Sequence, residues 1–196
     1  MSRQYCTRCE RPLVTCICDC IRPIDNQVEI CFLQHPSESK QAKGSVKLAH
    51  LCLNKSRIIV GENFTNNDEL NQMLQRPRQQ AYLLYPSESA TVATPMAAKL
   101  QANTLLIVLD GTWKKAYKML QLSKNVQALP RLTLDKQIKS QYVIRKHHKP
   151  TDVSSLEACA HALAILEHNQ MRYQPLFDAF AQFNKQQILL QQQYQR

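Results

Sequence analysis

The sequence predicts an α/β domain in which a mostly parallel sheet is flanked by helices. Short apolar runs alternate along the chain with segments of helical periodicity, as in βαβ units. The strongest run, Thr104–Leu109, is continuously apolar after its first residue, which is typical of a strand buried on both faces. With 196 residues, the chain is long enough for one such domain and at most a small appendage.

The expected elements follow a short cysteine-rich segment, which ends at a boundary near Asp25-Asn26. The expected strands are Val28–Leu33, Arg57–Val60, Ala81–Leu84, Thr104–Leu109 and Tyr142–Arg145. The expected helices are Ser39–Leu53, Asn67–Leu74, Thr94–Leu100, Trp113–Leu122, Ser155–Asn169 and Pro175–Gln193. We therefore divide the chain into a small module over residues 1–24 and a catalytic domain over residues 25–196.

The chain is strongly basic, with a formal net charge of +10 and an isoelectric point of about 9.3. A charge of this size indicates an anionic partner, which can be nucleic acid, a membrane surface or an acidic protein. No apolar run approaches the ~20 residues that span a bilayer, and the first residues lack the apolar core of a signal peptide. We therefore expect a cytoplasmic protein without a membrane role.

Glycine is scarce, since the chain contains only Gly44, Gly61 and Gly111. Neither a G-x-G-x-x-G fingerprint nor a Walker loop can be built from these three positions. Dinucleotide-binding Rossmann enzymes and P-loop NTPases are therefore unexpected classes. A nucleotide-like ligand would need a different backbone geometry.

Five cysteines lie within the first twenty residues, and four of them form the close pairs Cys6-x-x-Cys9 and Cys16-x-Cys18. Four thiolates at this spacing suit tetrahedral zinc, and metal ligation can replace the core that so short a segment lacks. Cys20 is an alternative ligand, and a set of reduced, unliganded thiols is the alternative to a metal site. The segment also carries Arg3, Arg8, Arg11 and Arg22, for which RNA contact is an expectation.

The turn Asp110-Gly111-Thr112-Trp113 follows the most apolar of the expected strands. Ligands of parallel α/β sheets bind outside the carboxyl ends of the strands, so the turn is the leading candidate for an active site. A carboxylate there is costly to bury unless it is paired or lies at a pocket mouth. Trp113 can stack on a base or an adenine ring. The alternative assigns Asp110 to helix capping and Trp113 to core packing.

Two other expected strands are followed by similar short sequences, His35-Pro36-Ser37-Glu38-Ser39 and Tyr85-Pro86-Ser87-Glu88-Ser89. Proline stops a strand, and serine or glutamate can cap a helix that follows. The two segments are either ordinary strand-to-helix turns or two sides of one ligand site. In the second case, a helix N-terminus would offer N–H groups to a carboxylate or phosphate.

Polar residues in the last third of the chain complete the candidate set. Ser154 and Glu157 have the spacing of a helix capping box. Arg145 has the planar fork that binds carboxylate or phosphate. Lysines expected to contact RNA are Lys40, Lys43 and Lys47 on one predicted helical stripe, Lys114 and Lys115 after the turn, and Lys146.

These residues together resemble a known family, the DTW-domain proteins. The resemblance rests on Cys6-x-Arg8-Cys9-x-Arg11-Pro12, Cys16-x-Cys18, His35-Pro36, Tyr85-Pro86, Asp110-Gly111-Thr112-Trp113, Leu129-Pro130, Tyr142-x-x-Arg145 and Ser155-x-Glu157-Ala158. The ordered set covers nearly the whole chain and is specific, although each piece alone is weak. Within the family, it is most similar to the bacterial members that act as tRNA-uridine aminocarboxypropyltransferases.

The resemblance implies a SPOUT-like knotted fold, which needs no glycine motif, with tRNA and S-adenosylmethionine as partners. It implies transfer of a 3-amino-3-carboxypropyl group to N3 of a uridine in the tRNA variable loop, with release of methylthioadenosine. Asp110 and Trp113 are the expected catalytic residues. Residues expected to bind S-adenosylmethionine are Leu84, Tyr85, Pro86, Asp110, Leu129, Pro130, Arg145, Ser154, Ser155 and Glu157. The alternatives are a SPOUT-type RNA methyltransferase and a non-enzymatic zinc-containing RNA-binding protein, and a monomer is expected.

Overall fold

The computed structural model describes residues 4–39, 41, 43–87, 90–93, 103–135 and 153–194. Its centre is a six-stranded sheet with the order β2-β1-β5-β3-β6-β4, in which every pair of neighbours is parallel. The strands are β1 (Glu29–Gln34), β2 (Ser56–Val60), β3 (Gln80–Leu84), β4 (Thr91–Val92), β5 (Thr104–Asp110) and β6 (Arg131–Thr133). The predicted α/β class with a parallel sheet is therefore confirmed.

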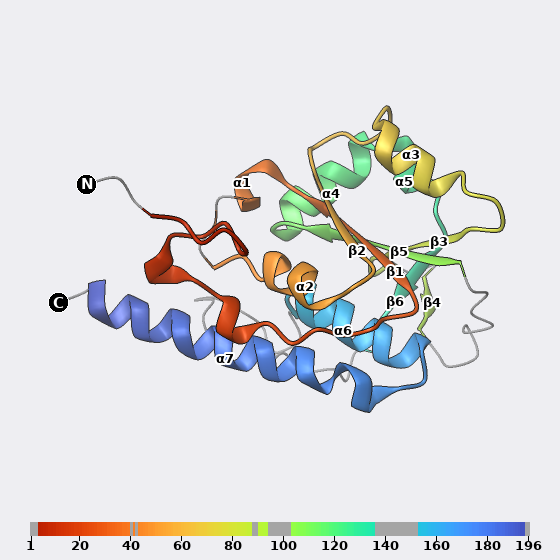
Figure 1. Ribbon diagram of the computed structural model, residues 1–196. Coiled ribbons are helices and arrows are strands. Elements are labelled where there is room, and N and C mark those ends of the chain that lie inside the picture. The colour runs from red at the N-terminus through yellow and green to blue at the C-terminus, as the bar shows by residue number, and fades with distance from the viewer. Residues whose placement is uncertain are drawn as a thin grey trace.

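Helices cover both faces of the sheet (Figure 1). On one face lie α3 (Asp68–Leu74), α4 (Trp113–Leu122) and α5 (Lys124–Gln127), and on the other lie α2 (Val46–Cys52), α6 (Ser155–Leu166) and α7 (Gln170–Tyr194). The short α1 (Pro36–Ser39) follows β1, and two 3-10 turns, η1 (Leu13–Thr15) and η2 (Cys18–Cys20), form part of the N-terminal segment. No helix of the described ranges is long and apolar enough to cross a membrane.

The continuous apolar run of β5 reflects this three-layer arrangement. All seven residues of the strand are buried. Leu106 and Val108 point into the core beneath α2, α6 and α7, whereas Leu105 and Ile107 point into the core beneath α3, α4 and α5. Because side chains alternate between the two faces of a strand, a strand covered on both faces favours apolar residues at consecutive positions, as at Leu105–Leu109.

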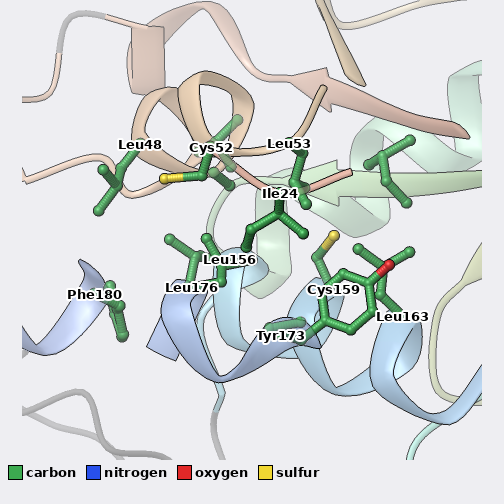
Figure 2. Packing of buried hydrophobic residues seen from close by; sticks show 14 of the residues in the cluster. Ile24, Leu48, Cys52, Leu53, Leu156, Cys159, Leu163, Tyr173, Leu176 and Phe180 are labelled. Atoms are coloured by element: carbon green, nitrogen blue, oxygen red, sulfur yellow. The ribbon is translucent and has the colours of Figure 1, made fainter. Parts of the chain in front are cut away.

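The larger core lies between the sheet and the helices α2, α6 and α7. Figure 2 shows Leu48 and Cys52 of α2 facing Leu156 and Leu176 of α6 and α7. The cysteine-rich segment contributes buried residues such as Ile17 to the same cluster. The division into residues 1–24 and 25–196 stays a prediction, but the segment packs on the main core rather than around a core of its own.

The predicted helix Ser39–Leu53 is wrong as one element, because α1 ends at Ser39 and α2 starts only at Val46. Gly44, a poor helix former, lies in the connection, and its carbonyl accepts a 2.9 Å hydrogen bond from Arg11 Nη2 of the N-terminal segment. Lys40, Lys43 and Lys47 therefore do not form one helical stripe, since Lys43 lies in the connection and Lys40 lies outside the described residues.

The predicted start of the last helix at Pro175 is also wrong. The helix α7 begins at Gln170, because the Asn169 side chain accepts a 2.9 Å hydrogen bond from the Arg172 N–H and caps the helix. His168, with a φ of 49°, separates α6 from this cap. The short strands β4 and β6 were not predicted, and the predicted elements Thr94–Leu100 and Tyr142–Arg145 lie outside the described residues.

Candidate functional site at the carboxyl edge of the sheet

The central strands β1 and β5 end side by side. Gln34 and Asp110 are paired in register, and the His35 N–H donates a 3.0 Å hydrogen bond to the Asp110 carbonyl. Because β5 lies between β1 and β3, the segments that begin at His35 and Tyr85 flank the Asp110 turn. The structure therefore brings both predicted strand-end segments to the same edge of the sheet as the turn.

The Asp110 carboxylate is held on both of its oxygens. Asp110 is only 8% exposed. Gln34 Nε2 donates a 2.8 Å hydrogen bond to Oδ2, and the Ser155 hydroxyl donates a 2.7 Å hydrogen bond to Oδ1. A buried carboxylate is costly without such donors, so these contacts explain how a strand that is otherwise apolar can end in an aspartate.

Ser155 reaches Asp110 because a capping box fixes the start of α6. The Glu157 N–H donates a 3.2 Å hydrogen bond to the Ser154 hydroxyl, and Glu157 Oε2 accepts a 2.9 Å hydrogen bond from the Ser154 N–H. The predicted capping box is therefore confirmed. Ser154 and Glu157 are 3% and 1% exposed, so their side chains hold the helix terminus while that of Ser155 points to the carboxylate.

Gly111 and Thr112 shape the turn that follows Asp110. A Cβ at Gly111 would lie only 3.1 Å from the Lys115 Cβ, so the close approach of α4 favours glycine. The Thr112 side chain accepts a hydrogen bond from the Lys115 N–H and caps α4. Trp113 is 55% exposed, which excludes the alternative that it plugs the core.

A second polar network lies beside the turn, and it joins His35 and Ser37 of the first strand-end segment to Glu62, which the sequence did not single out. His35 Nδ1 lies 2.9 Å from the Ser37 hydroxyl, and His35 Nε2 lies 2.8 Å from a Glu62 oxygen. The hydrogen bond and charge of Lys118 lower the pKa of Glu62. Lys115 Nζ lies 2.7 Å from both Ser37 Oγ and Glu38 Oε1. No motif marked Gln34 or Glu62, because their roles depend on strand register.

The other residues predicted to bind S-adenosylmethionine do not all lie close to Asp110. Leu84 and Tyr85 are half-buried and Pro86 is exposed, all at the carboxyl end of β3. Since Leu83 pairs with Arg131, the preceding Leu129-Pro130 lies toward the amino ends of the strands and away from Asp110. Their proposed role stays a prediction. Arg145 and Lys146 lie outside the described residues.

The cysteine cluster has the geometry of a metal site. The sulfur atoms of Cys6, Cys9, Cys16 and Cys18 all lie within 4.8 Å of one another, with Cys6–Cys18 at 3.5 Å and Cys9–Cys16 at 3.7 Å. Tetrahedral Zn–S bonds of ~2.3 Å place sulfurs about 3.8 Å apart, so the four thiols fit zinc. Cys20 lies apart from the cluster, with its sulfur 3.9 Å from Gln186 Oε1 of α7.

The surroundings of the cluster favour the thiolate at Cys6, whereas burial raises the pKa of the Cys18 thiol. Backbone N–H groups of Cys9 and Arg8 donate hydrogen bonds to Cys6, and they lower the pKa of this thiol to about 6. Glu10, which follows the first pair, has a left-handed φ of 56° that folds the chain back around the sulfurs. Arg11 is largely buried, with its guanidinium 5.3 Å from the centre of the Phe183 ring of α7. Arg11 therefore holds the segment on the fold.

The fold and site define a parallel α/β protein with a four-cysteine cluster that has the geometry of a metal site and a buried carboxylate at the carboxyl edge of its sheet. The DTW domain family model matches residues 3–188, so the chain belongs to the DTW-domain family. No solved structure matches the chain.

Three relatives carry curated names. A protein of Macaca fascicularis named tRNA-uridine aminocarboxypropyltransferase 2 is 28% identical over 172 residues, which cover 85% of this chain and 58% of that protein. A Drosophila melanogaster protein of the same name is 30% identical over 84% of this chain and 67% of its own length. An Arabidopsis thaliana protein named tRNA-uridine aminocarboxypropyltransferase A is 28% identical over 84% of this chain and 73% of its own length. The chain thus spans well under two thirds of the macaque relative.

Proposed function

We propose that this chain transfers a 3-amino-3-carboxypropyl group from S-adenosylmethionine to N3 of a uridine in the variable loop of tRNA. Membership of the DTW-domain family and the names of the relatives support this activity. The main structural support for the proposed site is the Asp110 carboxylate, which lies at the carboxyl edge of the sheet with a hydrogen-bond donor on each oxygen. The net charge of +10 suits a polyanionic substrate.

Asp110 is the group that we assign to the uridine. The N3 atom carries a proton and is a poor nucleophile until that proton is removed or shared. Gln34 and Ser155 each use one acceptor position on a different oxygen, so the carboxylate is held in one orientation as an acceptor for the N3–H. When bound, S-adenosylmethionine supplies an electrophilic methylene carbon beside its sulfonium, where formation of the N3–C bond breaks the C–S bond and releases methylthioadenosine.

The groups that would hold S-adenosylmethionine lie around Asp110 or outside the described residues. The start of α6 at Ser155 offers the positive end of a helix dipole to the methionyl carboxylate, and Arg145 is a second candidate. Leu84 and Tyr85 would pack on the adenosine, with Pro86 at their rim. The trefoil knot of SPOUT-like folds is part of the proposal, as are the monomeric state and the cytoplasmic location.

Zinc has a structural role in this proposal. The four cysteines would hold the ion in a closed site, with every ligand position supplied by the protein. A closed site keeps no position for substrate, so zinc would hold the N-terminal segment on α7 and the α1–α2 connection rather than take part in the reaction.

Mass spectrometry of tRNA nucleosides after incubation with protein and S-adenosylmethionine tests the proposal. We expect a uridine that carries the added aminocarboxypropyl group, and no such product from the Asp110→Ala variant while it still binds tRNA. A methylated nucleoside would instead support an RNA methyltransferase. RNA binding without any modified nucleoside would support a zinc-containing RNA-binding protein.

A further inference from the structure

Three aromatic side chains form a row beside the Asp110 turn. Trp113 and Tyr117, one helical turn apart on α4, are 55% and 58% exposed. The ring of Tyr85, at the end of β3, meets Trp113 edge to face, with centroids 6.1 Å apart and planes at 73°. We call these three residues the aromatic row.

The packing of α4 does not account for this exposure. The helix buries Ala116, Met119 and Leu120 against the sheet, which is the apolar side that its fold requires. Trp113 and Tyr117 lie outside this side and leave large apolar surfaces in water. Adjacent exposed aromatic rings on a soluble protein mark binding surfaces more often than packing.

Several positively charged side chains lie next to the aromatic row. Burial raises the pKa of Tyr85, and the nearby positive charge of Arg131 opposes this shift. Lys114 is exposed on the turn of helix that carries Trp113. Lys115 and Lys118 of the same helix have the carboxylate partners Glu38 and Glu62. Within the described ranges, neither Lys114 nor Arg131 forms an ion pair with a carboxylate.

Flat apolar rings flanked by such cations suit a ligand that is both planar and anionic, and the nucleotides of a single-stranded RNA segment have these two properties. We propose that the two exposed rings of the aromatic row, Trp113 and Tyr117, stack on an unpaired nucleobase of the substrate RNA that neighbours the target uridine. The proposal rests on the proposed function, because it takes RNA as the substrate. It adds that the protein requires the bases around its target to be unstacked, since a base within a duplex offers no free face to an aromatic side chain.

Tryptophan fluorescence tests the proposal directly, because Trp113 is the only tryptophan of the chain. The probe is a single-stranded oligouridylate of about ten nucleotides, within the site sizes of stacking proteins. We expect it to quench the fluorescence, and a duplex of matched length at the same salt concentration to quench much less. Equal quenching by the duplex, or quenching by S-adenosylmethionine but not by RNA, would overturn the proposal.

Substitutions in the aromatic row provide a second test of the proposal. Trp113→Leu and Tyr117→Leu should each weaken binding of the oligouridylate about five- to a hundredfold, as expected for loss of one stacking partner. Tyr117→Phe should retain affinity, because the ring remains. Tyr5→Leu is the matched control, since Tyr5 is also 58% exposed but lies on the cysteine-rich segment. Anisotropy of a labelled oligouridylate measures all four variants, and thermal unfolding verifies that they fold.

The outcomes separate this proposal from the function on which it rests. If the wild-type protein modifies tRNA while both leucine variants keep the affinity for RNA and the KM for tRNA, the aromatic row has no stacking role and the transferase assignment stands. If the wild-type protein binds no RNA, the proposed function has failed, and the proposal fails with it.

Discussion

The hydroxyl of Ser155 donates a 2.7 Å hydrogen bond to the Asp110 carboxylate and thereby joins the end of β5 to the start of α6. The neighbouring Ser154 has a different task, since its side chain closes the capping box with Glu157. Ser155 therefore orients the carboxylate of the site, whereas Ser154 caps the helix.

Alanine substitutions at these two serines should have different effects. Ser154→Ala removes the helix cap and should cost about 1 kcal/mol of unfolding free energy, or a few degrees of Tm, with kcat at low temperature nearly unchanged. Ser155→Ala should lower kcat at least tenfold, because Asp110 loses a charge-assisted hydrogen bond. Thermal unfolding and turnover measure the two effects. An equal loss of kcat in both variants would contradict the separate roles of Ser154 and Ser155.

Gln34→Leu should lower kcat about ten- to a hundredfold and leave the KM for tRNA unchanged. The substitution keeps the size of the side chain but removes the amide that donates to Asp110 Oδ2, and a hydrogen bond to a charged group contributes about 1.5–3 kcal/mol. Steady-state kinetics with tRNA as the varied substrate separate the two constants. Turnover within twofold of wild type would show that the orientation of Asp110 does not matter.

Zinc should be present at one equivalent and should be lost on substitution of Cys9 but not of Cys20. The two cysteines are equally buried, at 1% and 2% exposed, yet only Cys9 belongs to the four-sulfur cluster. Cys9→Ser should lower the zinc content strongly and destabilise the protein by several kcal/mol, since metal binding stabilises the folded state. Metal analysis and thermal unfolding of both variants provide the measurement. Full zinc content in Cys9→Ser would refute the assigned ligand set.

Glu10→Gly should be more stable than Glu10→Ala by about 1 kcal/mol. Both changes remove the exposed ion pair with Lys47, but only glycine relieves the left-handed backbone at a φ of 56°. Denaturant unfolding of the two zinc-loaded variants measures the difference. Equal stabilities would mean that the turn after Cys9 carries no backbone strain.

Local patterns were enough to predict β1, β5, the capping box and the four-cysteine cluster. The apolar run of β5 is explained by burial on both faces, and the close spacing of Cys6, Cys9, Cys16 and Cys18 brings their sulfur atoms into one cluster. In these cases, the signal lies in residues close together in the sequence, and the physical cause is equally local.

The rest of the site depends on contacts between distant segments. The role of Gln34 depends on the pairing of β1 with β5, which places its side-chain amide at Asp110. The hydrogen bond from Arg11 to the Gly44 carbonyl, between α1 and α2, also joins residues that are far apart in the sequence. The exposure of Trp113 likewise depends on how α4 lies on the sheet.

The fate of two isotopic labels in S-adenosylmethionine tests the central claim most directly. One preparation carries the label in the methyl group and the other in the methionyl carboxylate, and each is incubated with the protein and unmodified tRNA. The account predicts that the carboxylate label enters tRNA, while the methyl label remains in methylthioadenosine, in an amount equal to the modified uridine. Methyl label in tRNA, with S-adenosylhomocysteine as the released product, would contradict it.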